Sequence, residues 1–337
     1  MLVLPLRVAC KRIKIPVQPS SEKIQSLFPA SLQLSIIIVN YKYQDYLIRC
    51  LDSLKKNLNN ISHEVIVVDN ESDEEMLESF RQDFPKTYFI SNVENLGYSR
   101  AFNQGFKISK GEYILLLNND TEVLPESLQT MLNMMKQHPT TGVLGCILVN
   151  SDHTIQESYG LRSGFVSEVI RKCYSNILYK KSAQTWSKYI LKKIYSSDKE
   201  VDWICGACMM FKRKALVDVR LMDESFFMYY EDRDVCLQLK EKGWAVRFTP
   251  KASIIHHHGI SAAKMPIQAA KAYRQSQLYF FKKNCSYFSF WLLKKYLYLK
   301  FRLYVGLWSL KKLMITIEAT DQSKFDKEML NLLRNYE

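Results

Sequence analysis

Short apolar runs alternate with amphipathic segments along the first 150 residues of the chain. Apolar runs predict strands at residues 34–41, 64–70, 87–92, 111–120 and 142–149, and the β-branched runs at 34–41 and 64–70 are typical of strands buried on both faces. The segments between them predict helices at residues 45–57, 72–84, 99–109 and 125–139, with Ser72 at an N-cap and Pro125 in a first turn. Because strands alternate with short helices, we expect right-handed β-α-β units and an α/β fold with a mainly parallel sheet.

Polar side chains stand where three of the predicted strands end. Asn40 and Asp69 close the first two strands, and Asn118, Asn119 and Asp120 close the fourth. Asn and Asp commonly begin turns, which would account for one such end. Three successive ends favour a shared crevice, because ligands of parallel sheets bind at the carboxyl ends of the strands. Asp120 can offer a carboxylate to a hard divalent cation, and the two amides can bind ribose or phosphate without adding charge.

The composition is that of a globular protein. Hydrophobic residues make up 47% of the 337 positions, which suffices for a large core. The eight cysteines are scattered, so we expect reduced thiols; Cys205 and Cys208 could be structural, a redox pair or half of a zinc site. Residues 1–30 lack the features of a secretory signal and predict a flexible leader. The sequence contains neither G-x-x-x-x-G-K-S/T nor G-x-G-x-x-G, the glycine motifs of phosphate-binding loops.

Charge divides the chain into an acidic and a basic part. Residues 31–160 contain ten Lys/Arg and seventeen Asp/Glu, a net charge of −7, whereas residues 161–337 contain thirty-two against sixteen, a net charge of +16. The polar strand ends fall in the acidic part. A basic part of this size suits contact with nucleic acid, an anionic membrane or phosphorylated substrates. We therefore expect the two parts to have separate tasks.

Two further groups of residues could carry chemistry. Glu231 and Asp232 follow an aromatic, apolar stretch, where partial burial would raise a carboxyl pKa and suit general-base catalysis. The alternative is that these acids simply begin a helix, where the helix dipole favours them. Three consecutive histidines, from His256 to His258, follow a strand-like run and favour a metal or diphosphate role over a structural one.

The C-terminal part is basic and aromatic. Residues 260–317 contain eleven Lys/Arg, thirteen aromatic residues and no acid. The longest uncharged stretch there has ten residues, whereas a helix that spans a bilayer needs roughly 20. Cations interleaved with apolar groups favour a helix lying on an anionic membrane, while packing against the main domain and binding single-stranded nucleic acid are alternatives. Residues 171–193 repeat this pattern.

Taken in order, the segments resemble the inverting glycosyltransferases of family two with a GT-A fold. They are most similar to the rhamnosyltransferase-type enzymes of bacterial surface polysaccharide assembly. The resemblance covers about two thirds of the chain and is carried by "SIIIVNY", "CLDSL", "EVIVVDNES", "NLGYSRAFNQG", "YILLLNNDTEV", "GACMMFKRKAL", "FFMYYEDRDVCLQLKEKGW" and "IIHHHGIS". It implies a mixed, mainly parallel sheet with a nucleotide-sugar half at residues 31–150 and an acceptor half at residues 151–262. The basic segment near 165–200 would then be an insertion, and residues 263–337 a helical, membrane-associating extension.

The resemblance also implies roles for particular residues. Asp120 stands in the place of the family's D-x-D motif and would bind Mg²⁺ or Mn²⁺, with His256 or His258 nearby. Asp232, with Glu231 beside it, matches the acid that acts as the general base. The residues expected to contact or adjoin the nucleotide sugar are Asn40, Tyr41, Asp69, Asn95, Gly97, Arg100, Asn103, Asn118 and Asn119.

The expected function is transfer of a sugar from a nucleoside diphosphate donor, with dTDP-rhamnose the best candidate, to a lipid-linked or polysaccharide acceptor. The enzyme would act as a peripheral protein on the cytoplasmic face of the membrane. One alternative is the same chemistry with a UDP-hexose or UDP-N-acetylhexosamine donor. A second is a nucleic-acid-binding protein, suggested by the basic part; against it, the basic segments match no reader motif, so we expect no nucleic-acid partner.

Overall fold

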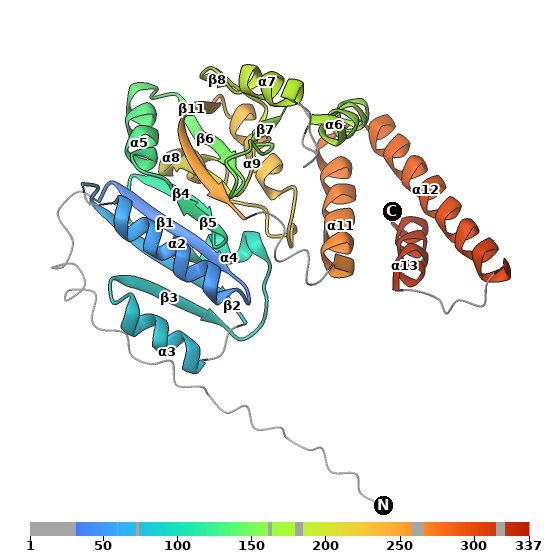
Figure 1. The fold of residues 1–337 in the computed structure, drawn as a ribbon, viewed down its shortest axis with the longest axis horizontal. Helices are drawn as coiled ribbons and strands as arrows, with labels where there is room; N and C mark the ends of the chain where they lie inside the picture. Colours follow the sequence, from blue (N-terminus) through green and yellow to red (C-terminus); the bar gives the residue numbers. More distant parts are fainter. Residues whose placement is uncertain are drawn as a thin grey trace, which may run out of the picture.

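A computed structural model describes residues 32–58, 60–71, 74–160, 164–178, 185–257, 266–314 and 321–336. The leader expected at residues 1–30, Ser72 and His258 lie outside this part of the chain. Its centre is a nine-stranded sheet with the order β3-β2-β1-β4-β10-β6-β11-β5, in which β8 also pairs with β11 (Figure 1). The strands of this sheet are β1 (Leu34–Asn40), β2 (His63–Asn70), β3 (Thr87–Asn92), β4 (Tyr113–Asn118), β5 (Thr121–Val123), β6 (Thr141–Val149), β8 (Lys199–Glu200), β10 (Cys208–Lys212) and β11 (Ala245–His256).

Helices surround this sheet, and a small second sheet pairs β7 (Tyr159–Gly160) with β9 (Trp203–Ile204). Three helices at the C-terminus form a separate layer to one side of the main sheet (Figure 1). The described helices are α2 (Gln44–Asn57), α3 (Glu74–Asp83), α4 (Tyr98–Ile108), α5 (Ser127–Gln137), α6 (Phe165–Leu178), α7 (Thr185–Ile194), α8 (Arg213–Asp218), α9 (Glu231–Glu241), α11 (Pro266–Asn284), α12 (Tyr287–Met314) and α13 (Asp321–Asn335).

Strand pairing confirms the predicted mixed, mainly parallel sheet. Strand β1 runs parallel to β2 on one side and to β4 on the other, and β6 runs parallel to β11. Strand β10 is antiparallel to both β4 and β6, which makes the sheet mixed. In this register Asn40 lies opposite Asp69, and Val39 lies opposite Asn118. The polar residues at the ends of β1, β2 and β4 therefore meet at one edge, as the sequence predicts.

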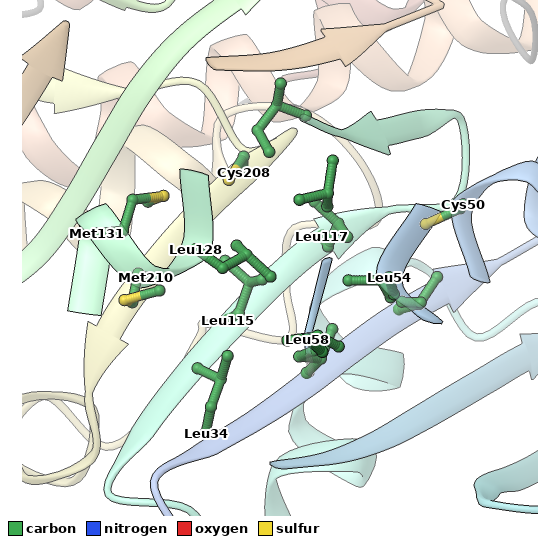
Figure 2. Packing of buried hydrophobic residues seen from close by; sticks show 14 of the residues in the cluster. Leu34, Cys50, Leu54, Leu58, Leu115, Leu117, Leu128, Met131, Cys208 and Met210 are labelled. Carbon is green, nitrogen blue, oxygen red and sulfur yellow. The ribbon is translucent and has the colours of Figure 1, made fainter. Parts of the chain in front are cut away.

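The core explains why the strands read as continuous apolar runs. Successive residues of a strand point to opposite faces of the sheet, and both faces of this sheet carry helices. Ile36 and Ile38 pack in the cluster that contains α2, whereas Ile37 packs in the cluster that contains α4. Figure 2 shows the first of these clusters, where Leu117 of β4 lies near Leu54 of α2.

The C-terminal helices have an apolar core of their own, and this core is joined to the main domain. Phe280 and Phe281 of α11 are buried in one cluster with Phe226 and Tyr230, which belong to the loop before α9. The sequence left open whether the C-terminal part packs against the main domain. Helix α11 does so. No helix in the described part of the chain is long and apolar enough to cross a membrane.

Two predicted boundaries differ from the structure. The fourth strand ends at Asn118, and Asn119 and Asp120 form the turn that leads into β5. Helix α5 begins at Ser127, so Pro125 precedes the helix and is not in its first turn. The reason is local: Glu126 has a φ of 60°, a left-handed conformation that an α-helix cannot include.

Candidate active site

A cavity of about 320 Å³ opens at the carboxyl ends of β1 and β4, between these strands and the N-terminus of α9. It therefore lies where a sheet of this kind binds its ligands. Most of the site residues predicted from the sequence line it. These are Tyr41, Asn95, Gly97, Asn118, Asn119, Asp120, Glu231, Asp232 and His256.

Four predicted residues do not line the cavity. Asn40 and Asp69 are buried behind its wall, with 1% and 0% of their surface exposed. Arg100 forms an exposed ion pair with Glu224, 3.6 Å from Nε to the carboxylate. Asn103 donates from Nδ2 to the carbonyl oxygen of Met222 and accepts from the Met222 amide, so it fixes the chain that leads to α9. Arg100 and Asn103 thus each have a partner on this neighbouring segment.

The buried amides form a chain of hydrogen bonds that positions the cavity wall. Nδ2 of Asn119 donates to Oδ1 of Asn40 at 2.7 Å, and Nδ2 of Asn40 donates to Oδ1 of Asp69 at 2.5 Å. Next to this chain, the Tyr98 hydroxyl donates to Oδ1 of Asn118 at 2.6 Å. A buried polar group keeps a fixed orientation when its hydrogen bonds are satisfied. The Asn118–Asp120 turn is therefore held in place from β1, β2 and α4.

Asp120 and His256 form the part of the site that could hold a cation. Nε2 of His256 lies 3.4 Å from Oδ1 of Asp120, and both residues are more than nine-tenths buried. On the other side of the ring, Nδ1 of His256 lies 2.9 Å from Oε1 of Gln156. The Gln156 amide nitrogen donates to the His256 carbonyl and to Asn150, which identifies Oε1 as an acceptor. Nδ1 therefore carries a proton, and Nε2 is the ring nitrogen that faces Asp120.

This donor set fits one divalent cation that shares its shell with a substrate. An imidazole nitrogen and a carboxylate oxygen 3.4 Å apart can both contact a cation placed beside them. Mg²⁺ takes only one or two protein carboxylates and completes its shell with water and phosphate oxygens. No cluster of three or more metal-ligating side chains occurs among the described residues, so the protein alone offers no closed metal site there. His257 points elsewhere, with Nε2 2.8 Å from Glu122.

Glu231 and Asp232 begin α9 and reach the cavity from the opposite side. The two residues before them, Tyr229 and Tyr230, have φ values of 73° and 68°. Non-glycine residues in this left-handed region are strained, and such strain concentrates at functional sites. Oδ2 of Asp232 accepts from the Gly206 amide at 3.0 Å, and Oδ1 accepts from the Arg233 amide at 2.8 Å. The Asp232 carboxylate is thereby held in one orientation.

The two carboxyls differ in how readily they lose a proton. Burial raises the pKa of Glu231 to about 8, with a further contribution from the negative charge of Asp232. Burial also raises the pKa of Asp232, but the charge of Arg233 and the amide hydrogen bonds oppose that rise. Within the described part of the chain, Oε2 of Glu231 is buried without a hydrogen-bond partner. Asp232 therefore ionises first, and Glu231 stays protonated at neutral pH.

Two functional features escaped the sequence analysis. The first is Gly206, which the sequence presented only as the residue between two cysteines of "CGAC". Its backbone amide donates to Oδ2 of Asp232 at 3.0 Å, so this residue helps to orient the acid through its main chain. The cysteines themselves are free thiols, and Sγ of Cys208 lies 3.8 Å from Sγ of Cys146 in the core. A structural role, one of the three roles left open for these cysteines, fits Cys208.

The second missed feature is a buried network that holds α9 from the inserted segment. The Arg233 guanidinium stacks over Trp203, with Cζ 4.4 Å from the ring centroid, and donates to Oε2 of Glu168 on α6 at 2.9 Å. Glu168 also accepts from Arg171 at 2.8 Å and from the Tyr230 hydroxyl at 3.1 Å. Burial alone would raise the pKa of Glu168, but the two arginines outweigh it and lower the pKa to about 2.

Helix α11 holds the same turn of α9 from the other side. Asp234, which is fully buried, accepts from Nζ of Lys283 at 2.9 Å and from Nδ2 of Asn284 at 2.7 Å. Side chains of the first turn of α9 thus point in three directions. Glu231 and Asp232 face the cavity, Arg233 faces α6, and Asp234 faces α11. The C-terminal helices contribute to the geometry of the site in this way, although they lie far from the strand ends in sequence.

Comparison with known proteins identifies relatives of this chain. An N-acetylglucosaminyl-diphospho-decaprenol L-rhamnosyltransferase of Mycobacterium tuberculosis is 25% identical over 263 residues, covering 73% of this chain and 83% of the relative. Rhamnosyltransferase WbbL of Escherichia coli is 26% identical, covering 66% of this chain and 83% of its own. The low-salt glycan biosynthesis hexosyltransferase Agl10 of Haloferax volcanii is 25% identical, and the match covers 68% of this chain and 69% of the relative.

A solved structure and a family model complete the comparison. The crystal structure of GalNAc-T7 with UDP, GalNAc and Mn²⁺ has a TM-score of 0.52 at 16% identity, covering 67% of this chain and 44% of that chain. At this identity the likeness establishes the fold, which is GT-A-like. The model of glycosyl transferase family 2 matches residues 35–220, more than half of the 337 residues. The chain therefore belongs to glycosyl transferase family 2.

Proposed function

We propose that this glycosyltransferase moves a sugar from a nucleoside diphosphate donor to a hydroxyl of a lipid-linked acceptor, with inversion at the anomeric carbon. The observation that carries the proposal is the meeting, in one cavity, of the Asp120–His256 pair and the Glu231–Asp232 pair. The first pair suits the donor's diphosphate and the second suits an attacking hydroxyl. One in-line displacement needs both, at opposite sides of the reacting carbon.

Asp232 is the general base in this proposal. The acceptor oxygen attacks the anomeric carbon, the bond from that carbon to the diphosphate oxygen breaks, and Asp232 takes the acceptor's proton. Its amide hydrogen bonds from Gly206 and Arg233 keep it ionised and oriented. Glu231, protonated at neutral pH because its pKa is about 8, can donate a hydrogen bond to a substrate oxygen. Two neighbouring carboxyls with separated pKa values are a common arrangement for acid and base roles.

Asp120 and Nε2 of His256 would hold Mg²⁺ or Mn²⁺ in this proposal. Such an ion, when bound, neutralises negative charge that develops on the leaving nucleoside diphosphate. The contribution of this chain is to keep both ligands in place. Gln156 fixes the His256 ring, and the hydrogen-bonded turn at Asn118 to Asp120 fixes the carboxylate. In metal sites, a histidine ligand typically donates its other ring N–H to a nearby oxygen, which fixes the orientation of the ring.

Tyr41, Asn95 and Gly97 border the donor side of the cavity. Gly97 has a φ of 87°, and a Cβ there would lie 2.7 Å from the carbonyl oxygen of Phe227, so only glycine fits. Its amide donates to Oδ1 of Asn95 at 2.9 Å, which shapes the loop before α4. These residues form the wall on which we place the nucleotide, and Asn40 and Asp69 support that wall from behind.

We take rhamnose from dTDP-rhamnose as the first candidate for the donor sugar, since two of the relatives are named as rhamnosyltransferases. A relative named as a hexosyltransferase keeps UDP-hexose or UDP-N-acetylhexosamine as the alternative. A lipid-linked acceptor is supported by the name of the Mycobacterium tuberculosis relative, which contains a diphospho-decaprenol.

Helix α12 supports a position at an anionic membrane surface, on its cytoplasmic face. Its exposed apolar residues lie among lysines and arginines, and α12 contains no acid. These residues are Tyr287, Phe288, Trp291, Tyr296, Leu299, Leu303, Tyr304 and Leu307. Exposed apolar side chains beside cations bind interfaces between lipid headgroups and acyl chains.

A screen of sugar nucleotides tests the proposed function. The protein is incubated with dTDP-rhamnose, UDP-glucose or UDP-N-acetylglucosamine, with Mg²⁺ or Mn²⁺, and release of the nucleoside diphosphate is measured. We expect slow hydrolysis of one donor and faster turnover when a lipid-linked saccharide is added. Absence of hydrolysis and of transfer with every donor would refute the proposal.

A further inference from the structure

A second cavity, of about 430 Å³, is lined by residues of α12 and α13. These two helices form the outer part of the C-terminal layer, on the side away from the main sheet (Figure 1). Among the described residues, none lines both this cavity and the catalytic cavity. The proposed transfer reaction therefore leaves the second cavity without a role.

Part of the lining of the second cavity is apolar and well packed. Phe290 of α12 and Leu333 of α13 line the cavity and are buried in the core of the C-terminal helices, with 8% and 3% of their surface exposed. Nζ of Lys294 donates to the carbonyl oxygen of Tyr336, which ties α12 to the end of α13. Side chains packed in a core keep their positions, so the cavity is a preformed feature of the fold.

The rest of the lining is cationic and aromatic. Lys294, Lys295 and Arg334 bring three positive charges to the cavity, and no acid is among its described lining residues. Nζ of Lys295 lies 5.9 Å from the centroid of the Trp291 ring, which also lines the cavity. Guanidinium and ammonium groups bind phosphate oxygens through charge-assisted hydrogen bonds. The charge of the lining is therefore complementary to that of a phosphate group.

The cavity adjoins the surface that we place on the membrane. Tyr287 and Trp291 line the cavity and are also exposed apolar residues of α12, with 81% and 41% of their surface exposed. The Trp291 ring stacks on that of Phe288, with centroids 6.2 Å apart and planes at 14°. Tryptophan and tyrosine side chains favour the level of the lipid headgroups, because one end of each is apolar and the other polar. The second cavity therefore lies where a headgroup can reach it.

We propose that the second cavity binds the phosphate headgroup of an anionic phospholipid. Lys295 and Arg334 contact the phosphate oxygens, and Phe290 and Leu333 contact the first carbons of the acyl chains. Such a lipid carries its charge directly beside apolar chains, and the cavity offers cations beside apolar side chains in the same way. This inference rests on the proposed function in that it takes α12 to lie on an anionic membrane.

The test uses dihexanoyl-phosphatidylglycerol, kept monomeric below its micelle concentration, as the probe for the full-length protein. We expect the probe to change the tryptophan fluorescence, and Trp291→Phe to remove most of that change. Lys295→Gln and Arg334→Gln should each weaken binding about fivefold, the effect of one basic residue beside an anionic headgroup. Both side chains are exposed, so the fold should tolerate these changes. Lys327→Gln, which alters an exposed lysine of α13 outside the cavity lining, should leave binding unchanged.

A wild-type protein that does not bind the probe would overturn the proposal, and so would Lys295→Gln and Arg334→Gln variants that bind it as tightly as wild type. Equal binding of glycerol 3-phosphate would also overturn it, because the cavity would then hold a free phosphate. Equal binding of dihexanoyl-phosphatidylcholine would do the same, because the cations would then not select the headgroup.

Donor hydrolysis, measured on the same protein preparations, separates this inference from the proposed function. Lys295→Gln and Arg334→Gln should leave donor hydrolysis unchanged, because neither side chain lines the catalytic cavity. Loss of probe binding with intact hydrolysis in wild type would overturn the lipid site alone. Absence of donor hydrolysis in wild type would instead refute the proposed function, so the two failures are distinguishable.

Discussion

The guanidinium of Arg233 donates a 2.9 Å hydrogen bond to Glu168, and this buried contact joins helix α9 to helix α6. Arg233 follows Asp232 directly and also donates to it through its backbone amide. The position of the proposed base thus depends on a helix that lies more than sixty residues earlier in the chain. Helix α6 is therefore part of the support of the site.

Glu168→Gln should destabilise the protein by about 3–5 kcal/mol, because it leaves buried Arg233 without its anionic partner. The Glu168 pKa of about 2 lies below its ordinary value of 4.5, so the stabilisation is complete above pH 4.5 and is lost as pH falls toward 2. Urea unfolding should show a stability difference between wild type and variant that shrinks from pH 6 to pH 3. Glu157→Gln, which removes only an outer partner of Arg171, is the control; an equal loss in both variants would contradict the network.

The free energy of unfolding of the wild-type protein should fall as pH rises, and Glu231→Gln should make this fall smaller. The pKa of Glu231 is raised from 4.5 to about 8, so the folded protein binds a proton that the unfolded chain releases between these values. Stability therefore decreases as pH rises through this window, and glutamine removes that contribution. Chemical unfolding at pH 5 and pH 8 measures the change. If wild type and variant lose the same free energy of unfolding between these two values, Glu231 does not carry the raised pKa.

Asp120→Ala should remove the metal-dependent part of donor binding. Without the carboxylate, His256 alone faces the cation and the donor's diphosphate. Calorimetry with the sugar nucleotide, with and without Mn²⁺, measures the effect. Glu122→Gln, in the adjoining strand β5, changes an acid that pairs with His257 and should leave donor affinity unchanged. Equal donor affinity in wild type and Asp120→Ala would exclude Asp120 as the ligand.

Leu299→Gln combined with Leu303→Gln should release the protein from anionic vesicles. Both side chains are at least 60% exposed, so the fold should tolerate the change. Burial of a leucine side chain in an apolar environment contributes about 1.5–3 kcal/mol to the free energy of binding. Loss of two leucines from a membrane contact should therefore sharply lower the fraction of protein that co-sediments with the vesicles. Val93→Gln, which alters a residue that is 95% exposed on the main domain, is the control. Unchanged sedimentation of the double variant would remove α12 from the membrane contact.

Much of the sheet could be predicted because its cause is local. Strands buried on both faces must be apolar at every position, and this makes β1, β2 and β4 visible as continuous runs. Parallel pairing then brings their carboxyl ends to one edge, so Asn40, Asp69 and Asn118 could be placed together before the structure was known.

The support of the site could not be predicted in the same way. The contacts of Arg233 with Glu168 and of Asp234 with Lys283 join segments 65 and 49 residues apart, and no periodicity in the sequence reports them. The hydrogen bond from Gly206 to Asp232 joins residues 26 positions apart. The ion pair of Arg100 with Glu224 joins α4 to the loop before α9 in the same way. Long-range contacts of this kind depend on the tertiary packing.

The most direct test of the central claim is the rate of sugar transfer by Asp232→Asn. Asparagine keeps the size of the side chain and can accept one of the two amide hydrogen bonds, but it cannot take a proton. Donor affinity should stay within twofold of wild type, and transfer to the acceptor should fall by roughly 10²–10⁴-fold, the usual contribution of a well-placed base. A variant that binds donor normally and transfers sugar at the wild-type rate would contradict the assignment of Asp232 as the general base.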